Sequence, residues 1–147
     1  MGAAIAAQAL RPGLSLCLAG PLGAGKSVLA RAIIRAALKD SAAEVPSPTF
    51  TLVQVYDCEA GEIWHFDLYR LSAPEEIIEL GIEEAAARAI ALIEWPDRMG
   101  ALLPAERLDI ALGTDAVAPE VRHARIAAYG GAAERALAGV LAGQHQP

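Results

Sequence analysis

The chain of 147 residues has room for one domain with one core, which we expect to span residues 1–147. Its net charge of −6 argues against direct binding to nucleic acid, because an acidic protein gains nothing from releasing the counterions of a polyanion. Its longest apolar runs are too short to cross a bilayer, and Met1–Leu10 lacks the basic flank of a signal peptide. We therefore expect no membrane association and a cytoplasmic location.

The first part of the chain predicts a strand, a glycine-rich turn and a helix in immediate succession. A short helix over residues 3–10 is stopped by Pro12 and Gly13, and an apolar strand follows over residues 14–19. The helix expected over residues 28–38 carries apolar residues on all sides and should be largely buried. Strand, glycine-rich loop and helix together form the supersecondary unit of P-loop proteins.

The rest of the chain predicts a hairpin and then alternating helices and strands. Residues 50–56 and 62–68 alternate and are rich in β-branched and aromatic residues, so the sheet should contain an antiparallel pair. The next helix should have Ser72 as N-cap, with Glu75 completing a capping box. Further helices are expected over 74–79, 83–88 and 132–142, and further strands over 89–93, 108–112 and 124–129.

These elements predict an α/β fold. We expect a single P-loop NTPase domain with three layers and a mixed, partly antiparallel central sheet. The expected order gives no sign of an internal repeat, a low-complexity linker or a second domain.

The sequence GPLGAGKS at residues 20–27 fits the motif G-x-x-x-x-G-K-[ST] at every fixed position. Glycines permit positive φ and bring backbone N–H groups against phosphate oxygens, while the following helix points its positive end at the anion. Lys26 would place its charge on the β and γ phosphates, and Ser27 would offer its hydroxyl to Mg²⁺. The alternative is a chance match in a glycine-rich turn. The expected nucleotide contacts come from Gly23, Ala24, Gly25, Lys26, Ser27 and Val28.

Other nucleotide-binding classes are disfavoured by what the chain lacks. Many GTPases recognise guanine through N-K-x-D, but the sequence contains no Asn. Residues 97–100 match the GTPase motif D-x-x-G, but they follow Trp95 and Pro96 and are expected to form a loop without that function. No segment is long enough to form the arginine-rich lid of a nucleotide kinase. We therefore expect ATP and Mg²⁺ as cofactors.

A segment with three hydroxyl side chains, SPTFT at residues 47–51, lies between the P-loop helix and the next strand. A switch loop at this position would reach the γ-phosphate, and the hydroxyl of Thr49 or Thr51 could sense it through Mg²⁺ or a water. The alternative is a simple proline-containing turn that leads into a strand.

Two carboxylates are expected near the ends of strands. Asp67, within HFDLYR, could hold Mg²⁺ through water in the manner of a Walker-B acid. Glu94 ends a buried strand and could bind the metal or polarise the attacking water, with Asp67 taking the other role. The sequence leaves the two assignments open.

Two neighbouring side chains, Trp95 and Arg70, could have either a role in the site or a purely structural role. Trp95 could stack on the adenine, or it could cover the edge of the core. Arg70 could belong to the site, or it could pair with Glu75 or Glu76.

The order GPLGAGKS, SPTFTLV, HFDLYRL, ELGIEE and IEWPDR resembles the TsaE (YjeE) family of small bacterial ATPases. The resemblance runs from about Gly13 through Leu112, and SPTFTLV followed by HFDLYR and IEWP is typical of this family alone. The family acts in the formation of threonylcarbamoyladenosine at adenosine 37 of tRNA. The resemblance implies a protein that binds TsaB-like and TsaD-like partners and hydrolyses ATP to support their repeated turnover. Contact with tRNA would then be only indirect.

The resemblance also implies residue roles. Lys26 and Ser27 match the phosphate and Mg²⁺ ligands of the family, and Thr49 matches the switch threonine. Asp67 matches a Walker-B-like aspartate, and Glu94 matches the acidic residue beside the metal. The expected catalytic residues are therefore Lys26, Thr49, Asp67 and Glu94, and the expected metal-binding residues are Ser27, Asp67 and Glu94.

Three further positions compare with the family in different ways. Trp95 matches a tryptophan near the nucleotide, which favours a nucleotide contact. Pro21 replaces a frequent Asp and removes one backbone N–H from the loop. Ser27 replaces a frequent Thr but is an allowed Mg²⁺ ligand.

Two rival functions remain compatible with the sequence. In one, the chain is a nucleotide-dependent binding module in which ATP orders residues 47–51 for docking and hydrolysis is incidental. In the other, it is a small-molecule kinase that transfers phosphate to an acceptor other than water. For an ATPase we expect weak hydrolysis by the isolated chain and faster hydrolysis when a partner completes the site.

Overall fold

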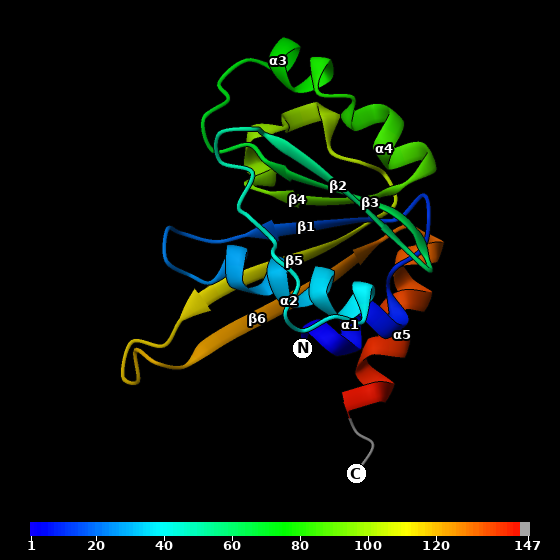
Figure 1. The fold of residues 1–147 in the computed structure, drawn as a ribbon. Helices are drawn as coiled ribbons and strands as arrows, with labels where there is room; N and C mark the ends of the chain where they lie inside the picture. The colour runs from blue at the N-terminus through cyan, green and yellow to red at the C-terminus, as the bar shows by residue number, and fades with distance from the viewer. Residues whose placement is uncertain (145–147) are drawn as a thin grey trace.

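Six segments of the chain join in one sheet, which is covered by helices on both faces (Figure 1). The computed structural model describes residues 1–144; residues 145–147 of the expected domain lie outside that part. In chain order the elements are α1 (Gly2–Gln8), β1 (Ser15–Ala19), α2 (Lys26–Leu38), β2 (Val53–Cys58), β3 (Gly61–Asp67), α3 (Pro74–Glu79), α4 (Ile82–Arg88), β4 (Ile90–Glu94), the 3₁₀ turns η1 (Pro96–Arg98) and η2 (Gly100–Leu102), β5 (Arg107–Thr114), β6 (Arg122–Tyr129) and α5 (Gly131–Gln144).

The sheet is mixed, as the sequence predicted. Its strand order is β2-β3-β4-β1-β5-β6. The four inner strands are parallel, whereas the edge strands β2 and β6 run antiparallel to β3 and β5. The predicted hairpin is present, with a tight turn in which Cys58 pairs with Gly61. This arrangement confirms the predicted α/β fold with a partly antiparallel central sheet.

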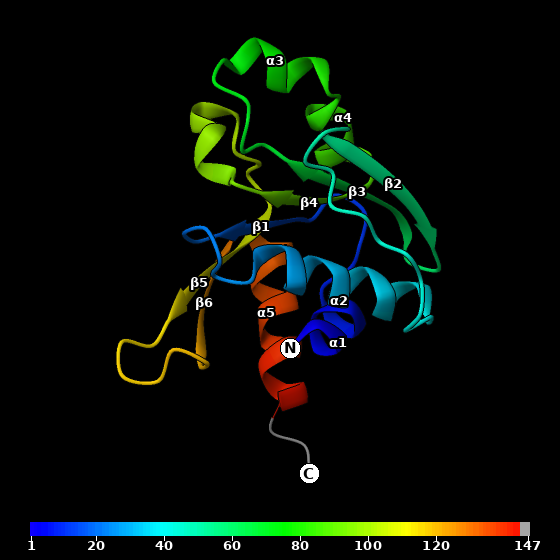
Figure 2. The same ribbon diagram turned by 60° about the vertical axis from the view of Figure 1, so that its left-hand side comes forward.

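Helices form a layer on each side of the sheet. Helices α1, α2 and α5 cover one face, and α3 and α4 cover the other, as the two views show (Figures 1 and 2). In β1 the side chains of Leu16 and Leu18 join the core on the α2 side, while Cys17 joins the core on the α3–α4 side. Among residues 1–144, no helix has both the length and the hydropathy that a bilayer crossing requires.

Because the sheet is covered on both faces, Cys17 of the central strand β1 is buried, and its thiol is unreactive. Desolvation, and after it the nearby charge of Asp109, together raise the pKa of the Cys17 thiol to about 12. A thiol with so high a pKa carries almost no thiolate at neutral pH, so Cys17 has a packing role.

The P-loop helix differs from its prediction in burial. It begins at Lys26, and it buries one side only. Ile33 and Ile34 are fully buried, whereas Val28 is 63% exposed. The helix lies on the sheet surface, so only the stripe that faces the sheet enters the core. The expectation of a largely buried helix was therefore wrong for the side that carries Val28.

Two further predictions were wrong at the ends of elements. The strand expected from residue 50 begins at Val53, because residues 49–51 form a turn. The N-cap of α3 is Ala73, without a side-chain cap, and not Ser72. Pro74 explains this shift, since its fixed φ and missing N–H suit the first helical position and place the cap one residue before it.

Candidate functional site

The candidate site lies where three neighbouring parallel strands end. In the register of the sheet, Leu18 of β1 pairs with Glu94 of β4, and Asp67 of β3 also pairs with Glu94. The loop at residues 20–25 leaves β1 at this edge and leads directly into α2. Ligands of open parallel sheets bind at the carboxyl ends of the strands, so both predicted acids lie in the expected place.

The glycine-rich loop takes the backbone conformation that its motif requires. Gly20, Gly23 and Gly25 have φ of 144°, 79° and 106°, which side-chain-bearing residues rarely adopt. The Ala24 N–H donates to the carbonyl oxygen of Pro21 at 3.1 Å, which closes a turn with Gly23 at its third position. Gly25 then forms the N-cap of α2. The free backbone N–H groups of the first turn of α2 therefore face the loop.

Replacing Gly20 with alanine is expected to destabilise the fold by about 2–4 kcal/mol, because strain and overpacking add. A Cβ at this position would lie 2.5 Å from the backbone oxygen of Leu112, at a φ of 144°. Gly143→Ala in helix α5 is the matched control: apart from the backbone of the helix itself, a Cβ there meets no atom of residues 1–144 within 4 Å, so stability should stay equal or rise slightly. Urea unfolding measures both. Equal midpoints for Gly20→Ala and the unsubstituted protein would contradict this description of the loop.

Lys26 is buried against its own loop. Its Nζ donates to the carbonyl oxygens of Gly20 at 2.5 Å and Pro21 at 2.9 Å, and it lies 3.9 Å from the ring centroid of Trp95. Burial lowers the pKa of the Lys26 ammonium from its ordinary value, while nearby carboxylates, Glu94 first, oppose that shift. The ammonium is thus desolvated and held by carbonyl oxygens and an aromatic face, in reach of an anion bound by the loop.

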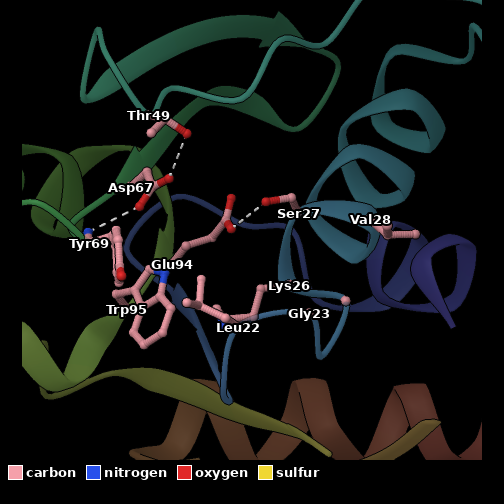
Figure 3. A pocket seen from close by; sticks show the side chains of 11 residues that line it. Leu22, Gly23, Lys26, Ser27, Val28, Thr49, Asp67, Tyr69, Glu94 and Trp95 are labelled. Carbon is pink, nitrogen blue, oxygen red and sulfur yellow. Dashed lines mark hydrogen bonds between the residues drawn. The ribbon is translucent and has the colours of Figure 1, made fainter. Parts of the chain in front are cut away.

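The two strand-end acids have different partners. Glu94 is 1% exposed; its Oε1 accepts a hydrogen bond from Ser27 Oγ at 2.9 Å (Figure 3). Asp67 accepts from Thr49 Oγ1 at 3.2 Å and from the Tyr69 N–H at 3.1 Å. Glu94 is therefore connected to the P-loop helix, and Asp67 is connected to the segment at residues 47–51.

These side chains enclose a pocket of about 400 Å³ (Figure 3). Of the residues that the sequence predicted, Ala24 has its side chain buried in the core on the α2 side and does not line the pocket. Sequence reasoning missed Leu22 and Tyr69, which do line it. Tyr69 stands two residues after Asp67 in HFDLYR, a position that offered a signal. The predicted residues that line the pocket are Gly23, Gly25, Lys26, Ser27, Val28, Thr49, Asp67, Glu94 and Trp95.

The structure separates the two threonines that the sequence left open. Thr49 lines the pocket and bonds Asp67. Thr51 is exposed, and its hydroxyl accepts a hydrogen bond from Gln54 Nε2 at 3.0 Å. Arg70 stacks over the ring of Phe50 at 4.5 Å, and within residues 1–144 it has no ion pair with an acid of α3. Thr49 is therefore the hydroxyl on the pocket side of this segment.

Strained backbone occurs at one residue that lines the pocket, Trp95, and at Leu52, whose carbonyl oxygen accepts from the Asp67 N–H. Leu52 and Trp95 have φ of 70° and 63°, although neither is glycine. Residues held in this region cost free energy and gather at functional sites. The Trp95 ring lies 4.8 Å from the Tyr69 ring, lines the pocket and also packs on the core of the α3–α4 side. The two readings of Trp95 are thus compatible.

The donor atoms in this pocket suit Mg²⁺. The hydroxyls of Ser27 and Thr49 and the carboxylates of Asp67 and Glu94 are all oxygen donors, which Mg²⁺ prefers. In the described part of the chain no group of three or more His, Cys, Asp or Glu forms a metal cage. Mg²⁺ in nucleotide sites is commonly bound by one or two carboxylates together with substrate phosphates, and Asp67 and Glu94 would supply such carboxylates here.

Comparison with known proteins identifies the family. The sequence model of "Threonylcarbamoyl adenosine biosynthesis protein TsaE" matches residues 1–123. The protein named tRNA threonylcarbamoyladenosine biosynthesis protein TsaE in Rickettsia conorii is 42% identical over 110 residues, which cover 75% of this chain and 62% of that protein. Its namesake in Rickettsia bellii is 42% identical over 106 residues, which cover 72% of this chain and 73% of that protein.

A solved structure supports the same fold. The crystal structure of YdiB from Bacillus subtilis superposes with a TM-score of 0.70 and covers 98% of this chain and 87% of that chain, at 24% identity. At this identity the likeness concerns the fold alone. Because the family model and the relatives match most of the chain, the chain belongs to the TsaE family.

Proposed function

We propose that the chain binds Mg²⁺-ATP between the P-loop and the two strand-end acids, and hydrolyses it in support of threonylcarbamoyladenosine formation on tRNA. The observation that carries this proposal is the bond from Ser27 Oγ to Glu94 Oε1. It joins the hydroxyl of a P-loop helix to a buried strand-end carboxylate, the pair that holds Mg²⁺ in P-loop NTPases. The family's part in tRNA threonylcarbamoyladenosine biosynthesis supplies the process.

In this proposal, different residues bind the phosphates, hold the metal and orient the attacking water. Backbone N–H groups of the loop and the ammonium of Lys26 bind the phosphates, after Lys26 exchanges the carbonyl oxygens of Gly20 and Pro21 for phosphate oxygens. Ser27 and Glu94 would hold Mg²⁺, which when bound draws charge from the phosphate oxygens. Asp67, next to Glu94 on the neighbouring strand, and its partner Thr49 also line the pocket and would orient the attacking water.

The site is incomplete for fast hydrolysis. Of the described residues that line the pocket, only Lys26 is cationic, and none is an arginine. A second cation near the transferred phosphoryl group often supplies several orders of magnitude in rate. We therefore infer that TsaB-like and TsaD-like partners complete the site in the cytoplasm, and that tRNA contacts this subunit only through them.

A nucleotide-dependent binding module is the second candidate, and one observation favours it. Phe50 is 79% exposed and follows Thr49, whose hydroxyl bonds Asp67 beside the pocket. If Thr49 turns toward a γ-phosphate, Phe50 moves with it and changes the surface offered to a partner. In this view ATP binding alone sets the contact.

Phosphate release from ATP discriminates the two functions. We expect slow release by the chain alone and at least about tenfold faster release when TsaB-like and TsaD-like proteins of the same organism are added, because a completed site gains electrostatic stabilisation. The Lys26→Ala variant gives the background. A complex that forms with ATP and with a non-hydrolysable analogue, but releases phosphate only at that background rate, would support the binding module instead.

A further inference from the structure

A buried histidine stands directly behind the candidate site. His65 lies in β3, two residues before Asp67, and is 1% exposed. Side chains alternate along a strand, so Ile63, His65 and Asp67 share the face that α2 covers, where Ile63 belongs to the core. Glu94 lies on the same face of the neighbouring strand, because Leu92 and Ile90 belong to that core as well.

The two oxygens of Glu94 have different donors. Nε2 of His65 lies 2.7 Å from Glu94 Oε2, while Ser27 Oγ donates to Oε1. An ionised carboxylate can only accept, so with Glu94 ionised the hydrogen of its bond with His65 is on Nε2. Both side chains are almost fully buried, with 1% and 2% of their side-chain surface exposed. Glu94 is thus held at both oxygens, from β3 on one side and from α2 on the other.

The other ring nitrogen of His65 has no hydrogen-bond partner in the described part of the chain. Nδ1 of His65 is buried and makes no hydrogen bond to any residue among 1–144. A buried polar atom without a partner is unfavourable, and an apolar residue at this position would avoid the cost while filling the same core. The bond from Nε2 to Glu94 is therefore the interaction that accounts for a histidine here.

Glu94 also acts electrostatically on a cation of the same pocket. The charge of Glu94 is the first of the three that act on the Lys26 ammonium. A Glu94 carboxylate that was free at Oε2 could turn toward Lys26, and both groups would then be withdrawn from phosphate and metal. The bond from His65 opposes that movement and keeps Oε1 on Ser27.

We propose that His65 is a positioning residue, which fixes the Glu94 carboxylate on Ser27 and thereby prepares the Mg²⁺ site. This inference rests on the proposed function and adds to it a residue that acts through Glu94. Groups of this kind, which orient a metal ligand from behind, typically change metal affinity 10- to 100-fold when replaced.

Two amide substitutions give a matched test. In His65→Gln the side-chain amide reaches about as far as Nε2 and can still donate to Glu94. In His65→Asn the amide stands near the position of Nδ1 and falls short. Both are polar and neutral, so they differ mainly in reach. Calorimetric titration of ADP with and without Mg²⁺ separates the metal contribution from nucleotide binding, and thermal unfolding checks that both variants fold.

We expect His65→Asn to weaken Mg²⁺-dependent ADP binding about tenfold or more and to leave ADP binding in EDTA within about twofold. His65→Gln should stay within about threefold in both conditions. In a Glu94→Gln background the Asn substitution should not weaken Mg²⁺-dependent binding further, because the negative charge that His65 orients is gone. In the metal-free protein, long-range ¹H–¹⁵N spectra should show the hydrogen of His65 on Nε2.

The same titrations distinguish a failure of the role of His65 from a failure of the proposed function. Equal Mg²⁺ dependence in the Asn variant, the Gln variant and the unsubstituted protein would overturn the role of His65 and leave the proposed function standing. The same holds if the Asn variant loses ADP binding equally with and without Mg²⁺. If the unsubstituted protein itself binds ADP no better with Mg²⁺ than in EDTA, the proposed function fails, and the inference fails with it.

Discussion

Lys26→Ala is expected to weaken ATP binding about 100-fold or more and to abolish partner-stimulated hydrolysis. Lys26 is the only cation among the described residues that line the pocket, and it is desolvated there, where charge interactions are strong. Isothermal titration calorimetry with Mg²⁺-ATP measures the binding, and phosphate release with the partners measures the rate.

The chain provides its own control for this substitution. Its only other lysine is Lys39, which pairs with Glu59 on the surface and has 75% of its side chain exposed. Lys39→Ala should leave ATP binding unchanged. Partner-stimulated hydrolysis that survives Lys26→Ala, or that falls equally in both variants, would mean that the proposed phosphate site is wrong.

Glu94→Gln is expected to lower partner-stimulated hydrolysis about 100- to 1,000-fold, to weaken Mg²⁺-dependent nucleotide binding about tenfold or more, and to leave nucleotide binding in EDTA within about threefold. Glutamine has the same shape, and its amide can still meet Ser27 and His65, so the fold should persist. It lacks the negative charge that would hold Mg²⁺ against Ser27. Single-turnover phosphate release separates this step from nucleotide binding.

A comparison with Asp67→Asn shows which of the two acids, Asp67 or Glu94, binds the metal. Asp67 contacts Thr49 and not Ser27, so its loss should slow hydrolysis with little change in Mg²⁺-dependent ADP binding, whereas Glu94→Gln should change both. Glu84→Gln, on the surface of α4, serves as the control and should change neither. An equal loss of Mg²⁺ dependence in Asp67→Asn and Glu94→Gln would contradict separate roles.

Most elements of the fold could be predicted from local patterns in the sequence. The apolar strand before GPLGAGKS and the two alternating segments after it predicted β1 and the β2–β3 hairpin. Asp67 and Glu94 were expected at strand ends, and each is the last residue of its strand. These features depend on a few consecutive residues, which is why they can be seen without the tertiary structure.

The sequence could not show what depends on contacts between distant segments. Thr49 and Thr51 are equivalent in a linear motif, and only the approach of Asp67 selects Thr49. His65 gives no spacing signal, since its partner Glu94 lies 29 positions away on a neighbouring strand. Val28 looks apolar and buried in the sequence, yet its exposure is decided by where the sheet lies.

The central claim is that the pocket between the P-loop and the strand-end acids binds Mg²⁺-ATP. Calorimetric titration of the full chain with ATP, in Mg²⁺ and in EDTA, tests it most directly. We predict saturable binding of one ATP per chain that is tighter with Mg²⁺ and is lost in Lys26→Ala. No binding at millimolar ATP, or equal binding by Lys26→Ala, would contradict it.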